Sequence, residues 1–211
     1  MFVHRDDPLI LEVGAHHGED SRQFLQVFAN CRLHVFEADP RCIEKLRQAV
    51  GRHPRCTVHA CAVAGESGLM DWYQSGGSPD GKRQDWDYSS SLLKPTAHLE
   101  HYPWCTFERK MRVQVVALDR LMFGAVDFIW MDVQGAEHLV LSGAAQTLER
   151  TRYLYTEYYD TPMYEGQLNL EGLRGMLPDF EVVGLFGQGL CTNALFENRR
   201  WADSPGTPTG A

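Results

Sequence analysis

The sequence predicts an α/β fold, with a doubly wound, Rossmann-like sheet that is mostly parallel and carries helices on both faces. Short, continuous apolar runs are typical of parallel strands buried on both sides, and the run from Leu9 to Val13 ends at Gly14 in this way. Between such runs lie segments whose apolar residues recur at helical spacing. Strands and helices of this length in alternation predict a parallel sheet.

The first half of the chain supplies three strands and two helices of this pattern. Phe24 and Phe28 are among the apolar residues of the first helix. Pro40 opens the second helix and Gly51 follows its end, which is the usual asymmetry of helix boundaries. In order, these elements are strand Leu9–Gly14, helix Glu19–Ala29, strand Arg32–Asp39, helix Arg41–Val50 and strand Cys56–Val63.

The second half continues the pattern after an interruption. The interruption, residues 76–109, is rich in Gly, Ser, Pro and Asp and carries several aromatic residues, so we expect an irregular insertion that contacts the acceptor substrate. We expect one domain over residues 1–198 and a disordered tail over 199–211. The remaining elements are strands Gly68–Gln74, Met111–Leu118, Val126–Val133 and Arg152–Tyr159, helices Gly135–Arg150 and Leu170–Leu177, and an antiparallel pair, Phe180–Gly187 with Cys191–Asn198.

Composition and charge restrict the class of protein. A formal net charge of -8 and a pI near 5.5 argue against nucleic acid as the main partner, because phosphate binding needs a basic surface. The sequence has no apolar run of membrane-spanning length and no leader pattern, so we expect a cytoplasmic protein with no membrane partner. The six cysteines do not have the spacing of zinc ligands, and the oligomeric state stays open, with a homo-oligomer among the alternatives.

A glycine turn follows the first strand and points to a nucleotide-like cofactor. Glu12, Gly14 and Gly18 form the pattern E-x-G-x-x-x-G, which allows a tight turn and a close approach of the backbone to a ligand. The dinucleotide pattern G-x-G-x-x-G has a glycine where this chain has His16, and a pyrophosphate would meet that side chain. A cofactor without pyrophosphate, such as S-adenosylmethionine (SAM), fits better.

An acidic residue lies at the end of the second predicted strand. Glu37 follows the glycine turn by about twenty residues, the position from which a carboxylate accepts the ribose hydroxyls of a cofactor. Its alternative role is a favourable charge at the start of the next helix. Asp39 stands beside Pro40 and is the better candidate for that structural role.

Six sequence blocks together resemble the FkbM family of SAM-dependent methyltransferases. They are, in order, ILEVGAHHG, VFEADP, HACAVAGESG, SSSL, VDFIWMDVQGAEHLVLSGA and LYTEYYDTPMYEGQ, and the resemblance spans roughly Leu9 to Phe196. The resemblance implies a seven-stranded sheet of order 3-2-1-4-5-7-6 with strand 7 antiparallel. It also implies methyl transfer from SAM to a hydroxyl oxygen of a glycan or a natural-product small molecule.

The resemblance and the glycine turn together assign a set of cofactor-binding residues. His16 and His17 depart from the family, which often has a small polar residue after the first Gly-Ala. Cys61 and Ala62, at the end of the third strand, offer no carboxylate for the adenine amine, so we expect backbone groups or a nearby polar residue to hold it. The assigned residues are Glu12, Gly14, Ala15, His16, Gly18, Glu37, Ala38, Ala62 and Asp132.

Three carboxylates are the candidate catalytic residues. An alcohol becomes a good nucleophile when a base removes its proton, and such a base should lie at the carboxyl end of a strand. Asp132 and Glu157 meet this condition; helix capping is the alternative for Asp132, and a satisfied buried pair is the alternative for Glu157. Glu137 is the third candidate, with a structural role in the first turn of a helix as its alternative. The spacing of the three does not specify a metal, and none is assigned.

The residues expected to contact the acceptor come from the turn, the insertion and a strand end. Aromatic rings with polar edges suit sugars and other ring substrates, although anchoring of the loop explains them equally well. The candidates are His17, Tyr88, Ser90, Ser91, Trp104 and Tyr159. N- or C-methylation, a non-catalytic binding protein and a nicotinamide-dependent dehydrogenase are the alternative functions, because fold alone does not determine function.

Overall fold

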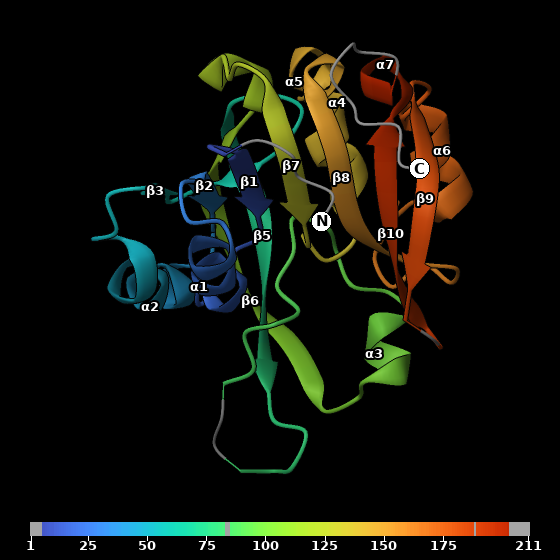
Figure 1. Ribbon diagram of the computed structural model, residues 1–211. Helices are drawn as coiled ribbons and strands as arrows, with labels where there is room; N and C mark the ends of the chain where they lie inside the picture. Colours follow the sequence, from blue (N-terminus) through green and yellow to red (C-terminus); the bar gives the residue numbers. More distant parts are fainter. Residues whose placement is uncertain (1–5, 83–84, 188, 203–211) are drawn as a thin grey trace.

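A computed structural model describes residues 6–82, 85–187 and 189–202 (Figure 1). A seven-stranded sheet of order β3-β2-β1-β7-β8-β10-β9 forms its centre. When the strands of this sheet are numbered by their place along the chain, the order is 3-2-1-4-5-7-6. The expected α/β fold is therefore confirmed.

The N-terminal half of the sheet alternates strands and helices as predicted. β1 and β2 pair in parallel, with Leu9 opposite Arg32, and β2 pairs in parallel with β3. Asp39 caps α2 by accepting a hydrogen bond from the backbone N–H of Arg41 at 2.9 Å, as its position beside Pro40 predicted. The elements are β1 (Leu9–Val13), α1 (Glu19–Val27), β2 (Arg32–Phe36), α2 (Pro40–Val50) and β3 (Cys56–His59).

The C-terminal half adds two parallel strands and an antiparallel pair. β7 pairs in parallel with β1 and β8, whereas β10 runs antiparallel to both β8 and β9. β10, the seventh strand of this sheet along the chain, is therefore antiparallel, as expected. The elements are β7 (Val126–Met131), α4 (Glu137–Ser142), α5 (Ala145–Glu149), β8 (Thr151–Tyr159), α6 (Leu170–Met176), β9 (Phe180–Phe186) and β10 (Cys191–Asn198).

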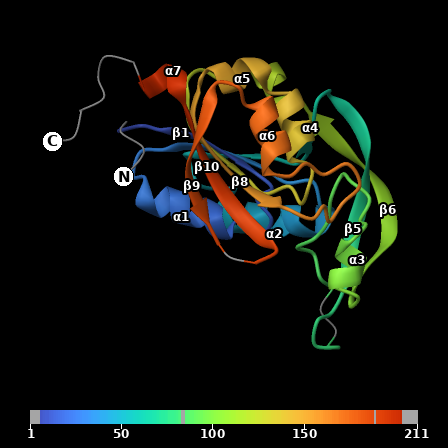
Figure 2. The ribbon, with the colours of Figure 1, turned by 90° about the vertical axis from the view of Figure 1, so that its right-hand side faces the viewer.

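Helices cover both faces of the sheet (Figure 2). α1 and α2 pack on the face of β1, β2 and β3, where Ile10, Leu33 and Leu46 belong to one buried apolar cluster. α4, α5 and α6 lie on the opposite face, and a larger apolar cluster there includes Ile129 and Phe196.

The single helix expected over Gly135–Arg150 is two short helices. α4 ends at Ser142 and α5 begins at Ala145, with Gly143 between them. A Cβ atom at Gly143 would lie 2.1 Å from the backbone oxygen of Ala64, so this glycine lets the chain pass close to a neighbouring segment. The close contact explains the break, which helical periodicity alone does not reveal.

A second, three-stranded sheet of order β4-β6-β5 projects beyond the carboxyl ends of the central strands (Figure 1). Its long antiparallel pair occupies both ends of the segment that we expected to be irregular, so that expectation is wrong for residues 76–77 and 105–109. The strand expected over Cys56–Val63 is also split between the two sheets. The elements of this region are β4 (Ala62–Val63), β5 (Gly68–Gly77), α3 (His98–His101), β6 (Cys105–Val116) and the 3-10 helix η1 (Leu118–Leu121).

The C-terminal segment begins with a short helix, α7, over Arg199–Ala202. The disordered tail predicted from residue 199 is therefore wrong for these four residues, and residues 203–211 lie outside the described part of the chain. Among the described helices, none has the length and apolar character needed to cross a membrane.

Candidate functional site

A cavity opens where the carboxyl ends of β1, β2 and β7 meet the second sheet. This is the edge at which ligands bind in open α/β sheets. The segments that line it are the turn after β1, the end of β2, the junction of β3 with β4, one residue of β5, the loop before α3 and the segment after β7. Of the nine predicted cofactor residues, eight line the cavity: Glu12, Gly14, Ala15, His16, Glu37, Ala38, Ala62 and Asp132.

The ninth, Gly18, is not among the lining residues and has a structural role. It caps α1 with a φ of 84° and lies against Leu46, where a Cβ atom would come within 2.9 Å of that side chain. Gly14 has a φ of 92°, and a Cβ atom there would lie 1.8 Å from the backbone oxygen of Asp132. The two glycines therefore shape the turn, one at the cavity and one behind it.

Glu37 lies at the end of β2 and is buried in the cavity wall. Its carboxylate accepts hydrogen bonds from the backbone N–H groups of His16, at 2.8 Å, and Asp39, at 2.6 Å. Burial raises the pKa of Glu37 to about 7, against the opposing effect of these two hydrogen bonds. Each carboxylate oxygen can accept a further bond, so the group remains able to receive two ribose hydroxyls.

Acidic side chains dominate the polar part of the cavity wall. Glu12 is buried and accepts a hydrogen bond from the hydroxyl of Ser21, and burial raises the pKa of Glu12 to about 8. Of the residues that the structure describes, no lysine or arginine is part of this wall. It contains seven carboxylates, namely Glu12, Glu19, Asp20, Glu37, Asp39, Asp87 and Asp132. A cationic ligand, which would favour the ionised forms of these groups, therefore fits the wall better than an anionic one.

One end of the cavity is mainly apolar. Phe36, Ala62, Val63 and Leu92 line it together with Trp72, which comes from β5 of the second sheet. The indole N–H of Trp72 is buried and has no hydrogen-bond partner among the described residues. The sequence suggested a polar residue near Ala62 for the adenine, but it did not identify Trp72, because the pairing of the second sheet was not visible.

Asp132 follows β7 and opens into the cavity. Its backbone N–H donates to the oxygen of Val13 at 2.9 Å, and its carboxylate accepts from the side chain of Gln134 at 2.7 Å. The side chain is solvent-exposed through the cavity, while the surrounding protein raises its pKa by desolvation. α4 begins five residues later and is capped by Ala136, so Asp132 is not a helix cap.

Glu157 lies on β8, one strand away from Asp132. One of its oxygens accepts a hydrogen bond from the thiol of Cys191, and the other, Oε2, is buried without a partner among the described residues. Burial and then the negative charge of Asp132 raise the pKa of Glu157 to about 7. Glu157 is not among the cavity-lining residues, although its charge interacts with one that is.

Glu137 lies in the first turn of a helix, which matches the structural role given above as the alternative to a catalytic one. It is buried in the first turn of α4 and accepts the backbone N–H of Gly135 at 3.2 Å. Burial raises the pKa of Glu137 to about 8, and it is not among the residues that line the cavity.

Two of the six predicted acceptor residues, Tyr88 and Ser90, line the cavity. The others do not. Ser91 is fully buried and donates to the backbone oxygen of Gln134 at 2.8 Å. Trp104 packs against Trp86, with ring centroids 4.9 Å apart. His17 binds Asp87 beside the cavity, and Tyr159 lies at the end of β8.

A row of aromatic rings leads from the cavity across the sheet. Trp130 lines the cavity and stacks on Tyr155, with centroids 4.3 Å apart and an interplanar angle of 14°. Phe24 contacts Trp130 from one side, and Phe186 contacts Tyr155 from the other, at 5.7 Å and 6.0 Å. Tyr155 and Glu157 are two residues apart on β8, so their side chains face the same side of the sheet.

The chain matches a known family over most of its length. Residues 12–186 match the family described as the methyltransferase FkbM domain. The 2-O-methyltransferase NoeI of Sinorhizobium fredii (strain NBRC 101917 / NGR234) is 38% identical over 203 residues, which cover 94% of this chain and 83% of that protein.

Solved structures share the fold. The methyltransferase FkbM from Methylobacillus flagellatus KT superposes with a TM-score of 0.60 at 19% identity, and the match covers 90% of this chain and 44% of that longer one. Fibrillarin from Aeropyrum pernix, in complex with natively bound S-adenosyl-L-methionine, superposes with a TM-score of 0.50 at 13% identity and covers 93% of this chain and 68% of that one.

Proposed function

This chain belongs to the FkbM family of methyltransferases, and we propose that it transfers a methyl group from SAM to a hydroxyl oxygen of a glycan or a related ring-containing small molecule. The name of the relative in Sinorhizobium fredii, a 2-O-methyltransferase, supports an oxygen acceptor. SAM supplies an electrophilic methyl group on a sulfonium, so the protein contributes orientation and electrostatics.

The observation that carries the choice of cofactor is the charge of the cavity wall. Seven acidic side chains and, among the residues that the structure describes, no lysine or arginine line it; Arg41 and Lys45 pair with two of these acids, Asp39 and Asp87, from outside the lining. A dinucleotide would bring a negatively charged pyrophosphate against these groups, whereas SAM brings a sulfonium and an ammonium. The same wall therefore disfavours a nicotinamide dinucleotide and stabilises a cation.

Different groups of lining residues suit the ribose, the adenine and the cationic groups of SAM. Glu37 would accept the ribose hydroxyls, and the apolar end with Trp72 would enclose the adenine, towards which the unpartnered indole N–H could donate. Glu12 and Asp132, at the ends of β1 and β7, would lie on the side of the ammonium and the sulfonium.

The acceptor would approach over the aromatic row. Trp130 and Tyr155 offer stacked, partly exposed rings next to the cavity, and sugar rings pack well on such surfaces. Glu157 lies on the same face as Tyr155, and its buried Oε2 has no partner among the described residues, so it would accept the proton of the attacking hydroxyl. Asp132 would orient that hydroxyl from the cavity side.

Methyl transfer from labelled SAM to saccharides tests the proposal. A panel of mono- and oligosaccharides with a free 2-hydroxyl group is compared with the matching 2-deoxy compounds, and transfer is followed by release of S-adenosylhomocysteine (SAH) and by label in the sugar. We expect an O-methyl product with at least one hydroxyl compound and none with its 2-deoxy counterpart. Equal labelling of both would contradict methylation at that oxygen.

Calorimetry with SAH and NAD separates the cofactor from the acceptor. We expect SAH to bind and NAD not to, and Glu37→Gln to weaken SAH binding by roughly 1.5–3 kcal/mol, the value of charge-assisted hydrogen bonds. Glu181→Gln, a change at an exposed position of β9, is the matched control and should bind SAH normally. NAD binding without SAH binding would overturn the proposed cofactor.

A further inference from the structure

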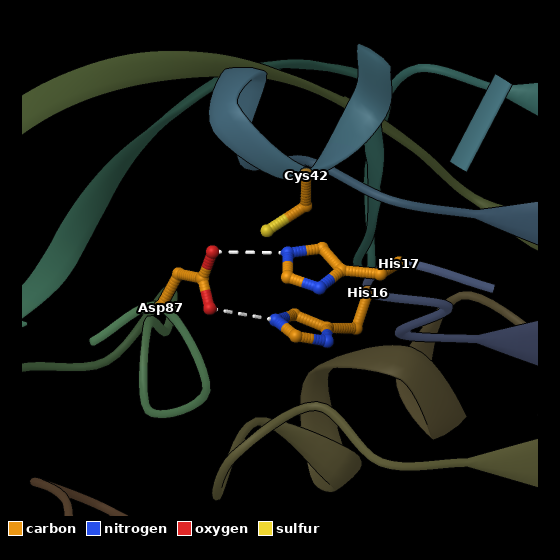
Figure 3. A group of neighbouring side chains, drawn as sticks. All are labelled: His16, His17, Cys42 and Asp87. Atoms are coloured by element: carbon orange, nitrogen blue, oxygen red, sulfur yellow. Dashed lines mark hydrogen bonds and ion pairs between the residues drawn. The ribbon is translucent and has the colours of Figure 1, made fainter. Parts of the chain in front are cut away.

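Four side chains from three separate segments meet beside the cofactor cavity (Figure 3). His16 and His17 come from the turn after β1, Cys42 from the first turn of α2, and Asp87 from the loop before α3. One nitrogen, sulfur or oxygen atom from each lies within 4.8 Å of those of the other three.

The four side chains are directed at one point. The two oxygens of Asp87 face the two histidine rings, at 2.9 Å from Nε2 of His16 and 3.0 Å from Nε2 of His17. The rings stack with centroids 3.6 Å apart, so both nitrogens face the same side. The sulfur of Cys42 points towards the same space in Figure 3.

We propose that His16, His17, Cys42 and Asp87 bind a divalent transition-metal ion of the zinc type. Two imidazoles, one thiolate and one carboxylate form a mixed set of the donors that Zn²⁺ takes in four-coordinate sites. A hard cation such as Mg²⁺ or Ca²⁺ is disfavoured, because it takes oxygen ligands rather than imidazole and thiolate. The carboxylates of the methyl-transfer site, Asp132 and Glu157, are not part of this group.

Burial and proton balance agree with a bound cation. Cys42 and Asp87 are buried, and the two histidines are partly buried. The ion would bind the thiolate and release its proton to solvent, and the charges of Cys42 and Asp87 would then balance that of the ion.

Lys45 is the group that competes with the ion. Its ammonium lies 3.0 Å from Nε2 of His17 and 3.4 Å from Asp87, and its side chain is 55% exposed on α2. Without a metal, this ammonium compensates the charge of Asp87. A bound cation would replace it, and the flexible, exposed side chain would turn to solvent.

A bound ion would fix the position of the loop that lines one side of the cavity. Asp87, Tyr88 and Ser90 belong to this loop and line the cavity, as does His16. A metal would join the loop to the cofactor turn and to α2, in place of hydrogen bonds from Asp87. The site would thus be structural and would sit on the wall of the cofactor cavity.

Metal titration of the tag-free, apo protein after chelator treatment tests this site. Zn²⁺ is titrated against a chromophoric chelator, and Co²⁺ is used as a spectroscopic probe of a thiolate ligand. We expect one ion per chain, a Co²⁺–thiolate absorption band, loss of that band in Cys42→Ser, and at least about tenfold weaker Zn²⁺ binding in Asp87→Asn and His17→Ala. Circular dichroism establishes that each variant is folded.

Three further variants make the outcome decisive. Lys45→Met removes the competing ammonium, so it should strengthen Zn²⁺ binding severalfold, whereas loss of a merely structural lysine would not. Cys56→Ser and His101→Ala, which lie outside the cluster, should bind Zn²⁺ like the unchanged protein. A stoichiometry other than one, equal losses in these controls, or a Co²⁺ spectrum unchanged by Cys42→Ser would overturn the assignment.

Discussion

The carboxylates of Glu157 and Asp132 interact electrostatically. Glu157 lies on β8, and Asp132 directly follows the neighbouring strand, β7. Burial raises the pKa of Glu157 to about 7, with the charge of Asp132 as the next contribution. A carboxylate with such a pKa is protonated below neutral pH and becomes a base above it. In the proposed reaction, the pair would divide two tasks: Asp132 would orient the hydroxyl and Glu157 would accept its proton.

The pH dependence of methyl transfer follows from this pair. We expect kcat/KM to rise with pH up to about 7 and then to level off, because Glu157 must lose its proton to act. Glu157→Gln should lower turnover by about 10²–10⁴-fold and remove this rise. Asp132→Asn should move the rise to lower pH, because it removes the charge that keeps the proton on Glu157.

SAH binding by calorimetry is the control for both changes, because each amide keeps the shape of the side chain it replaces. An unchanged pH profile and rate in Glu157→Gln would show that another group is the base. An unshifted profile in Asp132→Asn would show that the two carboxylates do not interact in the active protein.

At the scale of residues, the sequence predicted the cofactor turn better than it predicted the acceptor side. Glu12, Gly14 and Glu37 lie at or directly after strand ends, and the ends of parallel strands meet at one edge, so their meeting was predictable. Asp87 follows His17 by 70 residues in an irregular segment, and no local pattern links the two. The metal-ligand group was therefore invisible before the loop was placed in space.

The turn between β1 and α1 depends on a glycine at one position. Gly14 has a φ of 92°, and the backbone oxygen of Asp132 occupies the space of any Cβ atom there. Its backbone N–H and that of Ala15 both donate to the oxygen of Phe36, at 3.0 and 2.9 Å. The turn thus joins the ends of β1, β2 and β7 at the cavity.

Gly14→Ala should therefore disrupt this element. We expect loss of SAH binding and destabilisation by more than about 2 kcal/mol, because the conformation is strained and the contact is with rigid backbone. Gly175→Ala is the matched control, since Gly175 is exposed within α6 with no heavy atom within 4 Å of an added Cβ.

The control should stabilise the protein by about 0.5–1 kcal/mol, because alanine loses less conformational freedom in a helix. Chemical denaturation and SAH calorimetry measure both effects. Normal SAH binding by Gly14→Ala would show that the turn tolerates a side chain and that its shape does not control the site.

At the scale of elements, boundaries were predictable where local signals are strong. β10 has the predicted bounds, Cys191–Asn198, and α2 has the expected proline start. β6 begins at Cys105, six residues before the predicted strand, because Glu108, Arg109 and Lys110 give this exposed part no apolar alternation. The break between α4 and α5 depends on a distant backbone contact and is not a local property.

The molecule as a whole contains buried acids that favour their neutral form. Burial raises the pKa of Glu12 and Glu137 to about 8 and that of Glu37 to about 7. In the unfolded chain such groups ionise near pH 4.5, so between pH 4.5 and 8 the folded state binds more protons. The free energy of unfolding therefore falls as pH rises through this window.

Buried histidines oppose this trend only at lower pH. Burial lowers the pKa of His34 to about 4, and the pKa of His59 is lowered for the same reason. Their stabilising effect is complete above the unfolded pKa of about 6.5 and is lost as pH falls towards the folded value. Above about pH 6.5 the carboxyl groups set the sign, and buried thiols with raised pKa values, such as those of Cys56 and Cys191, act in the same direction.

The ligand-free protein should therefore melt at a lower temperature at pH 8.5 than at pH 6.5. We expect a decrease of roughly 5 °C, since about 1 kcal/mol shifts the Tm of a domain of this size by about 2–4 °C. Glu12→Gln should reduce the difference, because the amide stays neutral and still accepts the hydrogen bond of Ser21. A Tm that rises over this interval would contradict the protonated state of these acids in the fold.

β9 is the last strand of the central sheet, and among the described strands it pairs only with β10. Its outer edge leaves backbone donors and acceptors unpaired by the described strands, and Val183, Leu185 and Phe186 are exposed along it. A strand with such an edge is a template on which an extended segment of another molecule can add. We therefore expect charged residues introduced along this edge to delay the onset of turbidity in a concentrated preparation.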